Sequence, residues 1–294
     1  MSGSPLVSRK GPSGEIIPIY LPLVPSRVFE RRAARFRELA AGHAAADFLG
    51  ALACLADAQR LACQEVCVAV IGGRDPWPNV PLRFTEWHRG EAWQKALAVI
   101  LAEMGKTALP DPAQAALARL AASTPSELEA WADALLAYEI GRIDLAASPF
   151  LGAALQVYWT VLASGGPAQE PAASARGCPM CGSAPVAALV LGDGLRYLTC
   201  SLCSVEWHLK RVMCATCRST EGISYFTIEG DQGAAKAEAC DRCRTYLKLF
   251  YLEKRPRAEP FVDDVATLSL DLLMSEEGYS CGGVNLFLLS GAVA

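Results

Sequence analysis

Eight of the twelve cysteines lie between positions 178 and 243, and all eight are arranged as CxxC pairs. A CxxC turn lets two thiolates reach one ion, and two such turns complete a tetrahedron with metal–sulfur distances of about 2.3 Å. Four pairs therefore supply the ligands of two ions. The predicted metal ligands are Cys178, Cys181, Cys200, Cys203, Cys214, Cys217, Cys240 and Cys243.

The segments between the pairs form an internal repeat that indicates which pairs share an ion. In the first unit, residues 185–191 and 195–199 flank the turn Gly192-Asp-Gly194, as in a β-hairpin, and another alternating strand covers 205–209. The same order recurs at 223–228, 234–239 and 245–251, shifted by 36 residues at the first cysteine and 40 at the third. The repeat predicts sequential pairing, and a cross-braced arrangement is the alternative.

Closed tetrathiolate sites are structural with zinc, or transfer electrons when iron occupies them. Both metals accept four thiolates in a tetrahedron, and base rates favour zinc. Disulfide exchange is the other chemistry open to CxxC pairs, but thioredoxin-type motifs occur singly in a βαβ setting, which this sequence lacks.

The region before the cysteines is predicted to be helical. Apolar residues recur at three- and four-residue intervals from Ser26 to Ile71, and Gly42 divides this stretch into two helices. Pro76, Pro78 and Pro81 then predict a loop. Further helices are expected at Glu91–Met104, Pro112–Ala122, Pro125–Ile140 and Pro149–Ala163, the third of them opened by a capping box between Thr124 and Glu127.

These patterns predict an α+β protein: an all-α N-terminal domain, two tandem rubredoxin-like or zinc-ribbon-like metal modules, and a C-terminal helix. The expected division is an irregular leader at 1–24, a helical domain at 25–165, a linker at 166–177, the first ribbon at 178–212, the second at 213–256, and a helix with tail at 257–294.

Composition limits the partners. The formal net charge of −4 and pI near 5.5 give no general reason to bind nucleic acid, and the basic excess of the ribbon region is offset by its thiolates. The uncharged stretch between Leu145 and Gly166 is too short and too interrupted for a membrane span, so a buried helix is expected. No secretory signal is evident at the amino terminus, which predicts a cytoplasmic protein.

Other chemically suggestive residues have plainer interpretations. In Glu206-Trp-His208 the outer residues share one strand face, which favours packing or partner contact over catalysis. Cys63 and Cys67 suit an apolar helix core. The predicted roles of the remaining residues are a solvated helix face for Arg31, Arg32, Arg35 and Arg37, helix capping for Asp263 and Asp264, and docking of the last helix through Leu268, Leu272 and Leu273.

The region beyond the linker resembles the formate dehydrogenase accessory protein family, FdhE. The matching stretches are Cys178-Pro-x-Cys-Gly-Ser-x-Pro185, Gly194-Leu-Arg-Tyr-Leu-x-Cys200, Cys203-x-x-Glu-Trp-His208, Arg211-x-x-Cys-x-x-Cys217, Lys236-Ala-Glu-x-Cys-x-x-Cys243, Thr245-Tyr-Leu-Lys248 and Asp263-Asp-x-Ala-x-Leu268. The tail departs from the family pattern at Ser280-Cys-Gly282 and Asn285-Leu-Phe287.

The resemblance implies a cytoplasmic assembly factor rather than an enzyme. Its implied partner is the catalytic subunit of formate dehydrogenase, which is molybdenum-dependent and contains selenocysteine or cysteine. The resemblance also favours iron of the rubredoxin type over zinc in both sites. The sequence contains no GxGxxG, Walker loop or HExxH motif, which agrees with a binding role. A rubredoxin-like redox protein and a nucleic-acid-binding ribbon are the alternatives.

Overall fold

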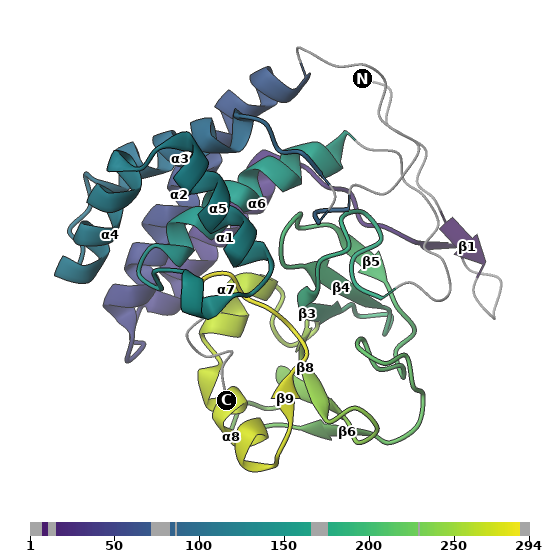
Figure 1. Ribbon diagram of the computed structural model, residues 1–294. Coiled ribbons are helices and arrows are strands. Elements are labelled where there is room, and N and C mark those ends of the chain that lie inside the picture. Colours follow the sequence, from purple (N-terminus) through teal and green to yellow (C-terminus); the bar gives the residue numbers. More distant parts are fainter. Residues whose placement is uncertain are drawn as a thin grey trace.

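The computed structural model describes residues 8–10, 16–71, 83–85, 87–165, 176–228 and 230–288. The predicted proline loop at positions 76–81 and most of the predicted linker lie outside these residues. Figure 1 shows the helices between residues 25 and 164 gathered on one side of the molecule and the main β-sheet on the other, with the helices after residue 259 beside the strands.

The first half of the described chain is helical, as predicted. Its elements are α1 (Pro25–Ala40), α2 (Ala46–Ile71), α3 (Ala92–Met104), α4 (Asp111–Ala122), α5 (Pro125–Leu136), the 3₁₀ helix Ile140–Arg142 and α6 (Ser148–Ser164). Gly42, with φ of +80°, separates α1 from α2. The capping box of Thr124 and Glu127 opens α5, which ends four residues earlier than predicted because Tyr138 adopts a left-handed conformation.

Helix α6 is the centre of the helical region. It contacts α1, α2, α3 and α5, and every residue from Phe150 to Ala163 is buried. The uncharged stretch is therefore a core helix, as its sequence predicted. Among the helices that the structure describes, none is both long and apolar enough to cross a lipid bilayer.

The second half of the chain builds one sheet from both ribbon units. Its strands are β3 (Pro185–Val190), β4 (Arg196–Cys200), β5 (Glu206–His208), β6 (Ile223–Phe226), β7 (Ala235–Cys240) and β8 (Thr245–Tyr251). Their order is β5-β4-β3-β8-β7-β6, and the short β9 (Ser280–Cys281) also pairs with β8. The two units join through β3 and β8, which run parallel with Ala188 opposite Leu249. The predicted hairpins are confirmed.

The amino-terminal segment pairs with the edge of this sheet, so the expected irregular leader is wrong for residues 8–10 and 16–20, whereas residues 21–24 are irregular as predicted. Strands β1 (Ser8–Lys10) and β2 (Ile16–Pro18) pair with each other. Beyond them, the amide of His208 donates to the carbonyl of Ile19 at 2.8 Å, and Tyr20 forms a bridge with Trp207. The segment thus covers the edge of β5, and its isoleucines suit extended backbone.

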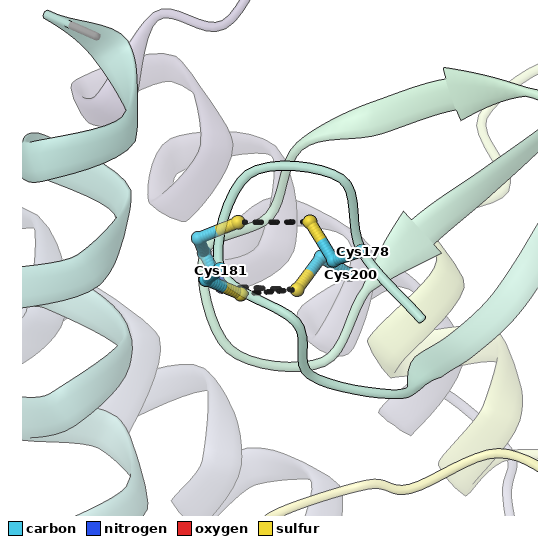
Figure 2. Close-up of side chains that lie close together, drawn as sticks. Cys178, Cys181 and Cys200 are labelled. Carbon is cyan, nitrogen blue, oxygen red and sulfur yellow. Dashed lines mark hydrogen bonds between the residues drawn. The ribbon is translucent and has the colours of Figure 1, made fainter. Parts of the chain in front are cut away.

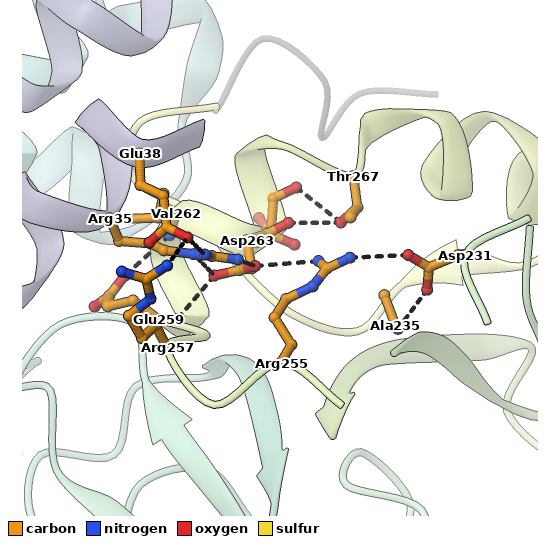
Figure 3. A network of polar contacts seen from close by, with 11 residues as sticks. Arg35, Glu38, Asp231, Ala235, Arg255, Arg257, Glu259, Val262, Asp263 and Thr267 are labelled. Atoms are coloured by element: carbon orange, nitrogen blue, oxygen red, sulfur yellow. Dashed lines mark hydrogen bonds and ion pairs between the residues drawn. The ribbon is translucent and has the colours of Figure 1, made fainter. Parts of the chain in front are cut away.

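Helix α7 (Pro260–Val265) lies between the helices and the sheet, and it is held by two buried arginines of α1. The guanidinium of Arg32 lies 3.2 Å from the Glu259 carboxylate. The guanidinium of Arg35 donates two hydrogen bonds, of 2.7 and 3.0 Å, to Asp263 (Figure 3). Arg255, which follows the turn after β8, donates to the same Asp263 carboxylate at 3.1 Å. These pairs fasten α1 to α7.

The expectation of a solvated basic face is therefore wrong for two of its four residues. Arg31 and Arg37 have side chains more than half exposed, whereas those of Arg32 and Arg35 are 0% and 6% exposed. Residues three apart on a helix share a face, and α7 covers the face that carries Arg32 and Arg35. Glu259 caps α7 by accepting from the Val262 amide.

The end of the chain also differs from its prediction. Helix α8 (Leu268–Glu276) docks through buried Leu270 and Met274, while Leu268 and Leu272 are 46% and 68% exposed. The divergent tail is nevertheless packed. Asn285 donates to the Phe261 carbonyl and to the Asp264 carboxylate, and Leu286 and Phe287 are buried.

Replacing Glu259 with Gln tests the buried ion pair. The variant leaves the Arg32 charge enclosed without its carboxylate, so we expect the free energy of unfolding to fall by about 3–5 kcal/mol. Urea unfolding followed by circular dichroism measures it. The control is Asp57→Asn, which removes an exposed ion pair with Arg37 and should cost under about 1 kcal/mol. Equal losses in the two variants would contradict the proposed role of the pair.

Candidate metal centres

All four CxxC pairs form the same tight turn. In the first, the Cys178 amide donates to the Ser183 carbonyl at 2.7 Å, and in the third the Cys214 amide donates to the Ser219 carbonyl at 2.7 Å. The residue after each second cysteine has a positive φ, which turns the chain back toward the pair. These residues are Gly182, Ser204, Arg218 and Arg244.

The turns bring the eight thiols together in two sets of four. We call Cys178, Cys181, Cys200 and Cys203 the first set, and Cys214, Cys217, Cys240 and Cys243 the second set. Within each set the sulfur atoms all lie within 4.8 Å of one another. This is the sequential grouping that the repeat predicted, and the cross-braced alternative is wrong.

The sulfur positions fit a tetrahedral ion better than a disulfide. In the first set, Sγ of Cys178 lies 3.6 Å from Sγ of Cys203, and Sγ of Cys181 lies 3.4 Å from Sγ of Cys200 (Figure 2). The corresponding distances in the second set are both 3.6 Å. A disulfide needs about 2.05 Å, whereas four sulfurs about 2.3 Å from a central ion lie about 3.8 Å apart. The described cysteines are all free thiols.

The buried thiols of each set are coupled in their ionisation. Burial raises the pKa of Cys181 and Cys203 well above the ordinary thiol value and raises the pKa of Cys214 to about 12. Burial also opposes ionisation of Cys200, but hydrogen bonds from the neighbouring cysteines hold its pKa well below the ordinary value. Four thiolates so close together would repel one another, and the charge of a bound cation would offset that repulsion. Each set can therefore hold one metal ion with no coordination position left open.

Backbone and side-chain donors support the negative sulfurs. The amides of Leu202 and Cys203 point at Sγ of Cys200 at 3.4 Å, and the Cys217 amide makes the same contact with Cys214. Such N–H···S contacts tune metal sites of this type. Burial opposes ionisation of Cys243, but hydrogen bonds from Thr245 bring its pKa down to about 7.

The sequence assigned no role at the metal sites to two residues that lie beside the sets. Thr245 lies 3.0 Å from Sγ of Cys243 through its hydroxyl oxygen. Tyr138, which is 38% exposed, follows α5 in a left-handed conformation, and its hydroxyl interacts with Ser183 and Ser201 beside the first set. Tyr138 could be found only from the fold, because it is distant in sequence from the cysteines that it approaches.

The other singled-out residues lie apart from the thiols. Glu206 and His208 share one face of β5, while Trp207 on the other face is 2% exposed, as the strand pattern predicted. Glu206 lies 3.6 Å from Arg31 and lines a cavity of about 250 Å³ between α1, β5 and the amino-terminal segment. Burial raises the pKa of its carboxyl group. Cys63 is core, and the side chain of Cys67 lies outside the described residues.

A helical region joined to a sheet with two closed four-cysteine knuckle sets defines a class of rubredoxin-like, non-haem metal-binding proteins. Three family models cover the chain in sequence: "FdhE, N-terminal" at residues 17–175, "FdhE, central domain" at 177–211 and "FdhE, C-terminal domain" at 212–288. The chain belongs to the FdhE family.

Individual relatives agree over nearly the whole length. "Protein FdhE homolog" of Cronobacter sakazakii is 38% identical over 290 residues, which are 95% of this chain and 94% of the relative. "Protein FdhE" of Salmonella paratyphi A is 38% identical over 97% of this chain and 95% of its own length. The crystal structure of the FdhE protein from Pseudomonas aeruginosa is similar, with a TM-score of 0.79 and 33% identity, covering 93% of this chain and 100% of that one.

Metal analysis tests the assignment of the eight cysteines. We expect two ions per chain by native mass spectrometry, and one ion fewer in Cys181→Ser and in Cys217→Ser, because three thiolates cannot fill the tetrahedron. The control is Cys54→Ser, which changes a half-buried helix cysteine outside both sets and should keep both ions. Two ions in every variant would show that other residues bind the metal.

Proposed function

We propose that this protein is an accessory factor for formate dehydrogenase, and that it binds the enzyme's catalytic subunit in the cytoplasm during maturation. The proposal rests chiefly on membership of the FdhE family over nearly the full length of the chain. The resemblance noted in the sequence covers the ribbon region, and the family model for the N-terminal part adds the helical region, residues 17–175. The protein acts by binding, and it is not itself a formate-oxidising enzyme.

The geometry of the thiol sets supports a binding role. Four thiolates saturate a tetrahedral ion, so a substrate has no position at which to coordinate while all four stay bound. We propose iron of the rubredoxin type in both sets, with zinc as the alternative that the same ligands accept. Either ion would hold two knuckles together and thereby stabilise the short strands between them.

The proposed client surface is the seam between the helices and the ribbons. One cavity there is lined by Arg27 and Arg31 of α1 together with Glu206 of β5. A second, of about 340 Å³, lies between α1, the β6–β7 turn and α8, and includes His43 and Arg255. Concave sites with a few charged groups are typical places for a partner segment to bind.

A rubredoxin-like redox protein is the second candidate, favoured by the N–H···S contacts to Cys200 and Cys214. Iron-loaded protein would then show visible absorption that is lost on reduction. A colourless, redox-silent preparation loaded with zinc from iron-rich medium would dismiss this candidate and leave the accessory role standing. A ribbon that binds nucleic acid is the third candidate, and it predicts salt-sensitive binding to oligonucleotides.

Co-purification tests the accessory role. Tagged wild-type chain should retain the catalytic subunit of formate dehydrogenase under reducing, metal-replete conditions. Arg27→Glu combined with Arg31→Glu should reduce the recovered subunit by about tenfold or more, since centrally placed arginines often dominate binding energy. Lys95→Glu is the control, because it reverses one exposed charge on α3 away from the seam.

The outcomes separate the proposals. Failure of the wild-type chain to retain the subunit would contradict the accessory role itself. Equal retention by the double variant and the Lys95→Glu control would contradict only the choice of surface.

A further inference from the structure

The two thiol sets have identical ligands but very different surroundings. In the first set, exposure is 3% for Cys178 and 0% for Cys181, Cys200 and Cys203. All four belong to the main hydrophobic core, which continues from the helices into the first ribbon. The first set is therefore enclosed on every side by packed protein.

The enclosure comes from the helical half of the chain. Gln156 of α6 donates to the Ser201 carbonyl at 2.9 Å, and Thr160 of α6 donates to the Ser204 hydroxyl at 3.3 Å. Both partners lie on the turn that carries Cys200 and Cys203. The Phe84 amide donates to the Cys181 carbonyl at 2.9 Å on the other turn. A reagent can reach these sulfurs only if the helices move away.

The second set lies at the surface. Cys214 and Cys240 are 4% and 1% exposed, but Cys217 and Cys243 are only partly buried. The residues inside the turns show the same contrast. Met180, Ser201 and Leu202 in the first set are buried, whereas their counterparts Thr216, Asp241 and Arg242 in the second are exposed.

No helix takes the place of α6 at the second set within the described residues. The hydroxyls of Thr216 and Thr245 hydrogen-bond at 3.2 Å beside Cys243. The tail pairs with the backbone of Arg244 and Tyr246, and its Gly282 passes close to the side chains of Thr216 and Thr245. Helix α8 packs on β7 and β9 through Leu270 and Met274 instead. One side of the second set, with Cys217 and Cys243, stays open.

Charged side chains of both signs surround this opening. Arg242 and Arg244 on the fourth turn are exposed, as is Asp241 beside them. The guanidinium of Arg244 stacks on the Tyr279 ring and donates to the carbonyl oxygens of Glu277 and Gly278. Four thiolates around a divalent ion would carry a net charge of −2, and an incoming thiolate that replaces a cysteine thiolate would leave that charge unchanged.

We propose that the two sets do different work: the first holds a permanent structural ion, and the second is an exchange site that accepts a thiolate from outside. The inference rests on the proposed metal binding. It adds that the ion of the second set binds a thiolate from another molecule. In the exchange, the incoming thiolate forms a sulfur–metal bond, and the bond to Cys217 or Cys243 breaks. The released cysteine takes a proton from solvent, and the oxidation state of the ion does not change.

Competition with a dithiol tests the division of labour in the intact, metal-loaded chain. We add excess dimercaptopropanesulfonate, follow the ions by native mass spectrometry, and label released thiols with iodoacetamide. One ion should leave at least about tenfold faster than the other, since a surface site opens without unfolding of the core. The early label should appear on the second set, with Cys217 and Cys243 foremost, while the first set stays unlabelled.

Matched variants assign the fast step. Cys243→Ser and Cys203→Ser change equivalent positions of the two repeat units. Cys243→Ser should abolish the fast phase and lower the melting temperature less than Cys203→Ser does, because the second set lies at the surface. Cys203→Ser should lower the melting temperature clearly, because its ion is part of the core. The labelling of wild-type protein stands as evidence even if Cys203→Ser does not fold.

Different results would refute the difference between the two sets and the metal binding itself. Release of both ions at one rate, or earlier labelling of the first set, would refute the division of labour. A freshly purified chain that contains no metal at all would instead refute the proposed metal binding on which the division rests.

Discussion

Buried thiols are costly when they must carry charge together, and this constraint shapes the sheet half of the molecule. The eight sulfurs form two groups of four, within each of which all sulfurs lie within 4.8 Å of one another, and burial opposes the ionisation of Cys181 and Cys214. A cation in each group would reverse that opposition. The strands between the turns are only three to seven residues long. Their geometry is accordingly set by the turns at their ends as much as by their own pairing.

The helical half depends on the same constraint through Gln156. Its amide oxygen accepts from Arg32 at 2.9 Å, and its amide nitrogen donates to the carbonyl of Ser201, inside a cysteine turn. Arg32 also stacks on Phe261, with its guanidinium carbon 3.9 Å from the ring centre. A polar path thus runs from α7 through α1 and α6 to the first set. One guanidinium nitrogen of Arg32, Nη2, has no hydrogen-bond partner in this path, and the ring of Phe261 packs against the same guanidinium group. Buried networks of this kind favour one arrangement of packed elements.

Much of this could be predicted from the sequence, because spacing alone reports local geometry. The repeat of cysteines and strands gave the grouping of the sulfurs, and apolar periodicity gave the helices. The burial of Arg32 and Arg35 could not be predicted, since their carboxylate partners lie more than 220 residues away. The pairing of Ile19 with β5 and the exposure of Leu272 likewise depend on contacts between segments that are far apart in the sequence. The spacing of the cysteines does not distinguish iron from zinc, because both metals bind four thiolates in a tetrahedron.

The parallel pairing of β3 with β8 joins the first strand of one repeat unit to the last strand of the other. Because two different strands of the repeat pair here, the contact is head-to-tail. Such a contact leaves a strand of each kind at the outer edges, whereas a contact between two identical strands would close a symmetric pair. In the described chain β6 ends the sheet, and it corresponds to β3 in the repeat. A duplicated copy inserted after the second unit could therefore lay its final strand along β6. The architecture could lengthen by tandem duplication without disturbing either existing thiol set.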